Sequence, residues 1–224
     1  MTGRRPDRPR LAEALAVYVI LDAEALSGRP LLNAARAAIR GGAGTLQLRA
    51  KRWDGRPLLE AARHLRPLTR AAGVLFIIND RVDVAVLAGA DGVHLGESDI
   101  PVADALRLMG PTAIIGFSPD DLDSARRAVA AGADYLGVGP AYATGTKPDA
   151  GPPIGPEGVG AVARTVPAPV VGVGGIRAGN AAQVIAAGAC GVAVTSAVLG
   201  APDIRRATAE LARAVRAARK EASS

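Results

Sequence analysis

The stretch VGVGGIRAGNAAQVIAAGACGVAVTSAVLG, residues 171–200, decides the fold. It begins within an apolar run, Pro169–Gly175, continues through an alanine-rich segment, Asn180–Ala187, and includes a second apolar run, Gly191–Ala197. Apolar runs that alternate with helical segments predict parallel strands joined by a crossover helix. Both runs are apolar almost throughout, which is typical of strands that are buried on both faces.

The same alternation extends toward the amino terminus, and it predicts a (β/α)₈ TIM barrel in a single α/β domain. The expected strands are Tyr18–Asp22, Thr45–Arg49, Leu75–Asp80, Gly92–Gly96, Ala113–Ser118, Tyr135–Pro140, Pro169–Gly175 and Gly191–Ala197. The expected helices are Leu31–Arg40, Leu58–Ala72, Val82–Ala88, Val102–Met109, Leu122–Ala131, Glu157–Thr165, Asn180–Ala187 and Asp203–Ala222.

A Gly-Ala pair recurs just before every second expected strand, which favours closure of the sheet into a barrel. The pairs are Gly42-Ala43, Gly89-Ala90, Gly132-Ala133 and Gly188-Ala189. Glycine there would end the preceding helix in the left-handed conformation. The alternative is an open doubly wound sheet, whose phosphate-binding glycines usually follow the first strand. Because Ala-Glu-Ala-Leu follows Asp22 instead, the barrel is favoured.

Composition narrows the class of protein. Hydrophobic residues make up 49% of the chain, so a large core can form. We expect residues 1–12 to be a basic, disordered tail and residues 13–224 to be the catalytic barrel. The net charge of +6 comes without a basic patch interleaved with aromatic residues, which argues against nucleic acid as a partner.

Location is predicted from three further features. The basic start of the chain lacks the apolar segment of a signal peptide, and no apolar run reaches about 18 residues, so we expect no membrane association. The single cysteine suits a reducing compartment. We therefore expect a cytoplasmic protein, and assembly into a homo-oligomer stays open.

Glycine-rich and hydroxyl-rich turns follow the last two expected strands. Gly174-Gly175 lies between one strand and its helix, and Thr195-Ser196 follows the next strand. Backbone amides at a helix start bind anions, and the loops after strands seven and eight are where barrels usually bind phosphate. Tight turns without a ligand are the alternative. Both turns in this order favour a phosphate site.

Two carboxylates follow neighbouring strands. Asp80 ends the third expected strand, and Asp99 lies just beyond the fourth. Proteins usually hold Mg²⁺ with one or two carboxylates, completed by water and substrate phosphates. Each residue could instead cap a structure, Asp80 the helix Val82–Ala88 and Asp99 the turn before Pro101. Their neighbouring positions beside cations favour a metal site.

Cationic, amide and hydroxyl side chains complete the expected site: Gln47, Arg49 and Lys51 at the end of the second strand, and Thr144, Thr146 and Lys147 in a long loop after the sixth. The first three alternate and therefore share one face. The loop that carries the other three could close over a bound ligand. Such groups, together with Mg²⁺, are suited to binding a pyrophosphate.

No nucleophile beside a base is evident. Cys190 lies in a Gly-Ala-Cys-Gly turn, which predicts a small buried residue. His64 lies among arginines in an expected helix and is predicted to be on the surface, and His94 is predicted to be a hydrogen-bonded residue of the barrel. A site rich in pyrophosphate-binding groups and poor in bases indicates chemistry that is driven by departure of a leaving group.

In their order, these motifs resemble the thiamine phosphate synthase family from about Tyr18 to Ala197. The motifs are Gln47-Leu48-Arg49-x-Lys51, Ile78-Asn79-Asp80-Arg81-Val82-Asp83, Gly89-Ala90-Asp91-Gly92-Val93-His94-Leu95-Gly96, Gly132-Ala133-Asp134-Tyr135-x-Gly137-Val138-Gly139-Pro140, Thr144-x-Thr146-Lys147 and Gly172-Val173-Gly174-Gly175-Ile176. Each motif is short, and their ordered combination is specific.

The resemblance implies an enzyme that joins hydroxymethylpyrimidine pyrophosphate to hydroxyethylthiazole phosphate, or its carboxylated form. Loss of pyrophosphate would leave a pyrimidine-methyl cation, which the thiazole nitrogen captures. The implied pyrimidine pyrophosphate contacts are Gln47, Arg49, Lys51, Asn79, Ser118 and Lys147, of which Arg49, Ser118 and Lys147 are assigned to catalysis. The implied Mg²⁺ ligands are Asp80 and Asp99, and the implied thiazole phosphate contacts are Thr144, Thr146, Gly175, Thr195 and Ser196.

The sequence departs from the family at two places. Ala50 stands where the family usually has an acidic residue, and Pro119-Asp120 follows Ser118 where the family often has a histidine two positions on. Two alternatives stay open: a thiazole tautomerase relative, which typically loses the metal acids and keeps that histidine, and a non-catalytic barrel that binds a phosphate ligand. Because Asp80 and Asp99 are present, the synthase is favoured.

Overall fold

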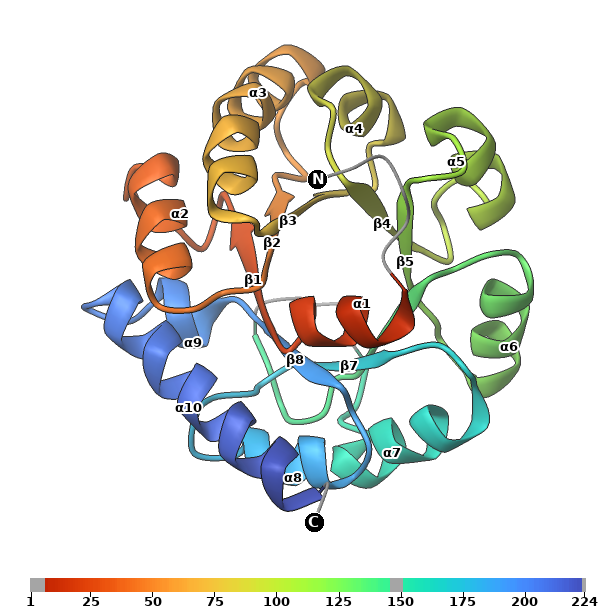
Figure 1. Cartoon of the computed structure of the whole chain (residues 1–224). Coiled ribbons are helices and arrows are strands. Elements are labelled where there is room, and N and C mark those ends of the chain that lie inside the picture. The colour runs from red at the N-terminus through yellow and green to blue at the C-terminus, as the bar shows by residue number, and fades with distance from the viewer. Residues whose placement is uncertain (1–6, 146–150, 223–224) are drawn as a thin grey trace.

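The computed structural model describes residues 7–145 and 151–222, in which eight parallel strands pair in chain order and close into a barrel (Figure 1). Strand β1 pairs with β2 on one side and with β8 on the other, so the sheet has no free edge. The helices lie around the outside of the barrel (Figure 1). The predicted TIM barrel is confirmed, and the open doubly wound sheet is excluded.

The predicted elements are recovered with small shifts at their ends. The strands are β1 (Val17–Asp22), β2 (Thr45–Arg49), β3 (Leu75–Asn79), β4 (Gly92–Gly96), β5 (Ile114–Ser118), β6 (Tyr135–Val138), β7 (Val170–Val173) and β8 (Gly191–Val194). The helices are α1 (Arg8–Ala14), α2 (Leu31–Arg40), α3 (Gly55–Ala72), α4 (Val82–Ala88), α5 (Val102–Met109), α6 (Leu122–Ala130), α7 (Gly155–Thr165), α8 (Ala181–Ala186), α9 (Ser196–Leu199) and α10 (Ile204–Ala222).

Four strands end earlier than expected because their last residues turn into loops. Asp80, Pro140, Gly174-Gly175 and Thr195 lie beyond the strands, where the chain leaves the sheet. Backbone that no longer pairs in a ladder can turn its polar groups toward a ligand. The predicted strand boundaries are therefore least accurate in the segments that form the mouth of the barrel.

Apolar side chains fill two layers, one on each side of the sheet. Residues such as Leu46 and Leu48 point outward and pack beneath the helices. Residues such as Tyr18, Ile77 and Ile114 point inward and fill the barrel near the starts of the strands. Because successive side chains of a strand point to opposite faces, each strand contributes to both layers.

Helix α1 corrects the expected tail. The boundary at residue 12 was wrong, because residues 8–14 form a helix whose first turn is capped by Asp7, which accepts a hydrogen bond from the Arg10 amide at 3.0 Å. Leu11 and Leu15 are buried in the inner layer, so α1 closes the amino-terminal end of the barrel (Figure 1). Leu11 is the buried leucine of α1 and Leu15 is its C-cap, so few core residues, set among charged residues and prolines, leave little periodic signal. Residues 1–6 lie outside the described residues.

The repeated Gly-Ala pairs adopt the predicted backbone conformation. The glycines have φ angles of +99° at Gly42, +62° at Gly89, +106° at Gly132 and +119° at Gly188. In two of the repeats an aspartate follows and ties the chain to the preceding strand: Asp91 accepts from the Phe76 amide at 2.9 Å, and Asp134 accepts from the Ile115 amide at 2.8 Å. These bonds fix where β4 and β6 enter the barrel.

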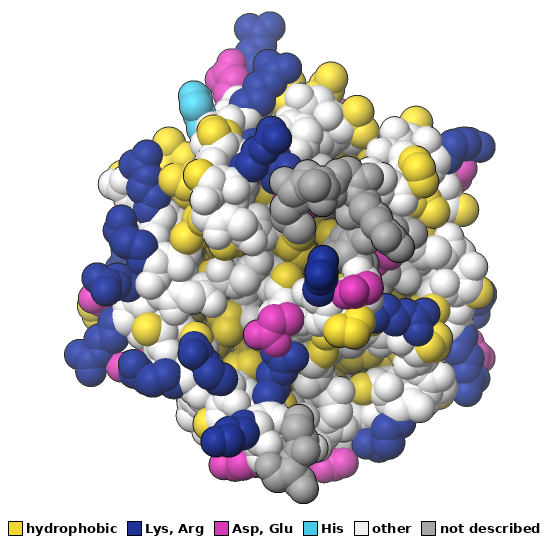
Figure 2. Space-filling model, viewed as in Figure 1, with side chains coloured by type: hydrophobic (Ala, Val, Ile, Leu, Met, Phe, Trp, Pro, Cys, Tyr) yellow, Lys and Arg dark blue, Asp and Glu magenta, His cyan; other side chains and the backbone are white. Residues whose placement is uncertain are grey.

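The surface at the α1 end carries mixed charge. Figure 2 views this end and places most Lys and Arg side chains around the ring of helices, interspersed with Asp and Glu. On the described part of this face they do not gather into a single basic patch (Figure 2). Within residues 7–145 and 151–222, none of the helices has the length and apolar character needed to span a bilayer.

Candidate active site at the carboxyl end of the barrel

The predicted polar residues, joined by Asp22, come together at the end of the barrel opposite α1. Asp22, Arg49, Asn79 and Ser118 are each the last residue of a strand. The loops that follow the strands carry Lys51, Asp80, Asp99, Thr144, Gly175 and Thr195, and Ser196 begins α9. Parallel strands in a barrel all end on the same side, so these residues surround one mouth. Thr146 and Lys147 lie outside the described residues.

An ion pair between Asp22 and Arg49 joins the ends of β1 and β2, where the two residues are in register. Asp22 is only 3% exposed, and its Oδ1 accepts hydrogen bonds from the amides of Glu24 at 3.0 Å and Ala25 at 3.1 Å. The carboxylate is thus fixed on both sides and holds the Arg49 guanidinium in place. Sequence reasoning missed Asp22, although a polar residue that ends an apolar strand is the same signal that identified Asp80.

Asp80, Asp99 and Lys51 form a group of interacting charges at the mouth. The Lys51 Nζ lies 3.2 Å from Asp80 Oδ2. Burial and, next, the neighbouring Asp99 carboxylate raise the pKa of Asp80, and Lys51 offsets this only in part. Two carboxylates this close repel each other, and a bound cation would relieve the repulsion.

Of the two capping roles considered for the aspartates, the structure shows the turn at Asp99 and no helix cap at Asp80. Arg81 is at the N-cap of α4 and Pro101 at the N-cap of α5, and neither helix has a side-chain cap. Asp99 does stabilise a turn, because its Oδ2 accepts from the Gly96 amide at 2.7 Å. This bond holds Asp99 next to Asp80, so the turn supports the carboxylate pair.

Asn79 contributes a buried donor beside the carboxylates. Its Nδ2 is buried and, among the described residues, has no hydrogen-bond partner. An unpaired buried donor costs about 1–3 kcal/mol, which an acceptor on a ligand would recover. No cluster of three or more His, Cys, Asp and Glu that could hold a metal occurs in the described part of the chain. Two carboxylates are a donor set that fits Mg²⁺, because this ion usually keeps water and ligand oxygens in its coordination shell.

Five polar side chains form a hydrogen-bonded chain through the barrel interior. Gln47 Nε2 donates to the Tyr18 hydroxyl at 2.7 Å, and the Tyr18 and Tyr135 hydroxyls lie 2.9 Å apart. The Tyr135 hydroxyl lies 3.0 Å from His94 Nδ1, and His94 Nε2 lies 2.9 Å from Ser118 Oγ. The prediction that His94 is a hydrogen-bonded barrel residue is confirmed. Its contact with Ser118 was missed, because the sequence does not show the register that aligns β4 with β5.

Backbone forms the opposite side of the mouth. Gly174 and Gly175 follow β7 with φ angles of +92° and +64°. A Cβ on Gly175 would lie 2.6 Å from the Ala143 carbonyl oxygen, so this turn lies directly against the loop after β6. The Tyr142 hydroxyl donates to Gln183 Oε1 at 2.6 Å and lies 3.2 Å from the Asn180 carbonyl oxygen, which holds the two loops together.

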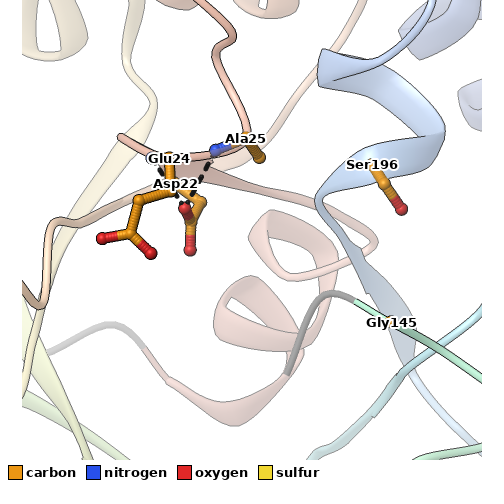
Figure 3. Close-up of a pocket in the computed structure, with 5 residues that line it drawn as sticks. All are labelled: Asp22, Glu24, Ala25, Gly145 and Ser196. Atoms are coloured by element: carbon orange, nitrogen blue, oxygen red, sulfur yellow. Dashed lines mark hydrogen bonds between the residues drawn. The ribbon is translucent and has the colours of Figure 1, made fainter. Parts of the chain in front are cut away.

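An open pocket of about 410 Å³ lies between parts of the mouth that are far apart in sequence (Figure 3). It is lined by Asp22, Glu24, Ala25, Gly145 and Ser196. In Figure 3 the acidic side chains come from the end of β1, Ser196 from the start of α9, and Gly145 from the loop after β6. The fold therefore brings the first and last strands to one cavity.

The remaining candidates for nucleophile or base lie away from the mouth. His64 is exposed on α3, as predicted. Cys190 lies just before β8, and the residue predicted to be small and buried is of intermediate exposure. Burial raises the pKa of its thiol to about 12, so the sulfur is neutral and a poor nucleophile near pH 7.

The two departures from the family pattern have local consequences. Ala50 is buried in the outer core, and Asp22 supplies the ion-pair partner of Arg49. After Pro119-Asp120, helix α6 is capped by Asp121, whose Oδ1 accepts from the Ser124 amide at 2.7 Å. The loop is thus closed by a carboxylate cap without a histidine.

Comparison with known proteins places these features in context. A family model described as thiamine monophosphate synthase matches residues 17–198. A thiamine-phosphate synthase of Moorella thermoacetica is 50% identical over 203 residues, covering 91% of this chain and 97% of the relative. One from a Roseiflexus species is 52% identical over 195 residues, covering 87% of this chain and 83% of the relative.

Comparison with solved structures points to the same family. Thiamine phosphate pyrophosphorylase from Pyrococcus furiosus matches with a TM-score of 0.85 and 42% identity, covering 93% of this chain and 98% of that one. A 3-hexulose-6-phosphate synthase matches with a TM-score of 0.62 at 20% identity, covering 88% and 99% of the two chains. The second match is evidence for the fold alone.

Proposed function

This chain belongs to the thiamine monophosphate synthase family, and we propose that it is the transferase that makes thiamine phosphate from two phosphorylated substrates. The substrates are hydroxymethylpyrimidine pyrophosphate and hydroxyethylthiazole phosphate, or its carboxylated form. The carbon–oxygen bond to pyrophosphate breaks, a carbon–nitrogen bond to the thiazole forms, and pyrophosphate leaves. With the carboxylated thiazole, the bond to the carboxyl group also breaks and carbon dioxide leaves. A biosynthetic enzyme with one cysteine suits the reducing cytoplasm, which is part of the proposal.

The observation that carries this proposal is the grouping of Asp80, Asp99 and Lys51 at the strand ends that also hold Arg49. Carboxylates next to cations are unsuited to a bare anion, because the negative charges would repel it. The same set suits an anion that arrives with a divalent cation. A pyrophosphate with Mg²⁺ meets this requirement.

Asp80 and Asp99 are the residues that would hold Mg²⁺, and hard carboxylate oxygens fit this ion. When bound, the ion would neutralise negative charge on the departing pyrophosphate. Arg49, held by Asp22, would bind pyrophosphate oxygens, and so would Lys51 and Lys147. These side chains are catalytic in that they stabilise charge that grows as the carbon–oxygen bond breaks.

Amide and hydroxyl groups would orient the pyrimidine. The Asn79 Nδ2, which has no hydrogen-bond partner among the described residues, would donate to an acceptor on the substrate. Gln47 and Ser118, which lie at the two ends of the hydrogen-bonded chain inside the barrel, would contact the pyrimidine as well. No base is needed to start the reaction, because the leaving group departs first. The thiazole nitrogen is itself the nucleophile.

The backbone side of the mouth would bind the thiazole phosphate. Gly175 allows amides of its turn to approach an anion, and Thr195, Ser196, Thr144 and Thr146 would add hydroxyl donors. The two substrates would then meet across the pocket of Figure 3. This division separates a pyrophosphate half from a monophosphate half.

The tautomerase alternative is less well supported. The relatives at about half identity are named thiamine-phosphate synthases, and this chain retains Asp80 and Asp99. A non-catalytic barrel that only binds a ligand would not need the two carboxylates of Asp80 and Asp99 beside Arg49. Neither alternative predicts release of pyrophosphate.

The test is to incubate purified protein with both substrates and Mg²⁺ and to measure thiamine phosphate and pyrophosphate. Equal amounts of the two products are expected, and omission of Mg²⁺ with a chelator present should abolish them. Absence of both products with authentic substrates would refute the synthase. Isomerisation of the thiazole carboxylate phosphate alone would support the tautomerase.

A further inference from the structure

The hydrogen-bonded chain that ends on Ser118 has a direction, and that direction decides what Ser118 can do. A serine 2.9 Å from a histidine nitrogen resembles the nucleophile–base pair of hydrolases. In such a pair the histidine accepts the hydroxyl proton. Whether His94 can accept that proton depends on the side chains that are hydrogen-bonded on its other side, Tyr135, Tyr18 and Gln47.

The direction follows from counting donors, starting at Gln47. Its Nε2 is a donor only, so the Tyr18 hydroxyl accepts from it. Among the described residues, the other hydrogen-bond partner of the Tyr18 hydroxyl is the Tyr135 hydroxyl, so the Tyr18 hydrogen points to Tyr135. Tyr135 then directs its own hydrogen to His94 Nδ1. With Nδ1 as acceptor, a neutral His94 carries its hydrogen on Nε2 and donates it to Ser118.

The barrel is built around these side chains. Tyr18 and Tyr135 are 2% and 0% exposed, and burial raises the pKa of both phenols, so both remain protonated donors. A Cβ on Gly116 would lie 2.4 Å from the Tyr135 hydroxyl oxygen and 2.5 Å from His94 Nδ1. A Cβ on Gly137 would lie 3.1 Å from His94 Cε1. Strands β5 and β6 thus leave space where the two rings meet.

We propose that Tyr18, Tyr135 and His94 are positioning residues that make Ser118 a hydrogen-bond donor to the bound substrate and prevent it from acting as a nucleophile. Ser118 Oγ accepts from His94, and its own hydrogen turns toward the ligand. The ligand atom it would meet is an acceptor, such as a ring nitrogen of the pyrimidine. The identity of that ligand rests on the proposed function, whereas the direction of the chain does not.

The first test locates one proton without any substrate. The chain contains two histidines, His64 and His94, so nitrogen-15 histidine labelling gives two ring spin systems, and His64→Gln assigns them. Long-range proton–nitrogen correlation spectra should place the His94 hydrogen on Nε2, with Nδ1 accepting a hydrogen bond. A hydrogen on Nδ1 would overturn the proposal, because His94 would then donate to the Tyr135 hydroxyl and its Nε2 would accept from Ser118.

The second test breaks the chain while preserving ring volume. Tyr135→Phe removes the hydroxyl that bonds Nδ1 and should shift the Nδ1 resonance of His94 downfield, and Tyr18→Phe should shift it less. An unchanged Nδ1 resonance in Tyr135→Phe would contradict the assigned role. Thr69→Val removes a buried hydroxyl elsewhere, one that donates to the Arg66 carbonyl oxygen within α3, and should leave the His94 spectrum as it was.

The third test separates donor from nucleophile. A fluorophosphonate, which modifies nucleophilic serines, should leave Ser118 unlabelled in intact-protein and peptide mass spectra. Labelling of Ser118 would overturn the proposal. In turnover, Tyr135→Phe should lower kcat about 10-fold, and Thr69→Val should not. An unchanged kcat in Tyr135→Phe would refute the positioning role, whereas inactivity of the wild-type protein with the expected proton on Nε2 would refute the proposed function alone.

Discussion

The two halves of the barrel mouth are built from different chemical groups. The carboxylate–cation half, formed by Asp22, Arg49, Lys51, Asp80 and Asp99 after β1 to β4, consists of charged side chains that hold one another. The backbone half, formed by Gly174, Gly175, Thr195 and Ser196 after β7 and β8, consists of turns and hydroxyls. The difference fits the proposed pair of substrates, one anion that needs a cation and one for which amide donors suffice.

The largest expected effect comes from the carboxylates. Asp80→Asn keeps the shape of the side chain and removes its charge, so we expect kcat/KM to fall about 1,000-fold at saturating Mg²⁺. The measurement is steady-state formation of thiamine phosphate over a range of Mg²⁺ concentrations. A matched control is Asp83→Asn, three residues on, whose carboxylate pairs with Arg81 on the surface. If both variants behaved like the wild type, the carboxylate–cation half would not be a metal site.

A smaller effect is expected in the backbone half. Gly175→Ala adds a Cβ 2.6 Å from the Ala143 carbonyl oxygen at a φ of +64°, so the turn must shift. We expect the KM of the thiazole phosphate to rise about 10- to 100-fold, with a much smaller change for the pyrimidine substrate. Gly179→Ala is the control, because a Cβ there meets nothing within 4 Å. Equal increases in both KM values would show that the halves are not separate.

The smallest expected effect concerns the ion pair that sequence reasoning missed. Asp22→Asn keeps an oxygen for the Glu24 and Ala25 amides but weakens the hold on Arg49. We expect kcat/KM to fall about 10-fold, through poorer stabilisation of the leaving group. Glu24→Gln, which changes an exposed pair with Arg52, should have little effect. A fall in Glu24→Gln as large as in Asp22→Asn would indicate a general charge effect of the pocket and not the positioning of Arg49.

The fold was predictable because its signals are local. Apolar runs, helix lengths and the Gly-Ala repeat lie within short stretches, and the glycines of the repeat do take the left-handed conformation. Helix α1 was not predictable in the same way. Leu11 and the C-cap residue Leu15 are buried only because the closed end of the barrel provides an apolar surface for them to pack against.

At the site, the sequence predicted which residues take part better than it predicted which of them contact one another. Asp80 and Asp99 were expected to be neighbours because adjacent strands end together, and the Asp80–Asp99 interaction agrees with this. Asp22–Arg49 and His94–Ser118 were not foreseen, because each pair depends on the register between strands. Register follows from the packing of the whole barrel, which no single motif contains.

The sequence by itself determined the barrel, the end at which its polar residues gather and the family to which they point, since periodicity and the order of motifs are properties of the chain. Only the tertiary structure decided which groups hold Arg49, which groups stand behind Ser118 and in which direction the hydrogen bonds between them run. The physical reason is that a hydrogen bond forms only when the donor–acceptor distance is within a few tenths of an ångström of its preferred value. Such distances are set by closure of all eight strands around one interior.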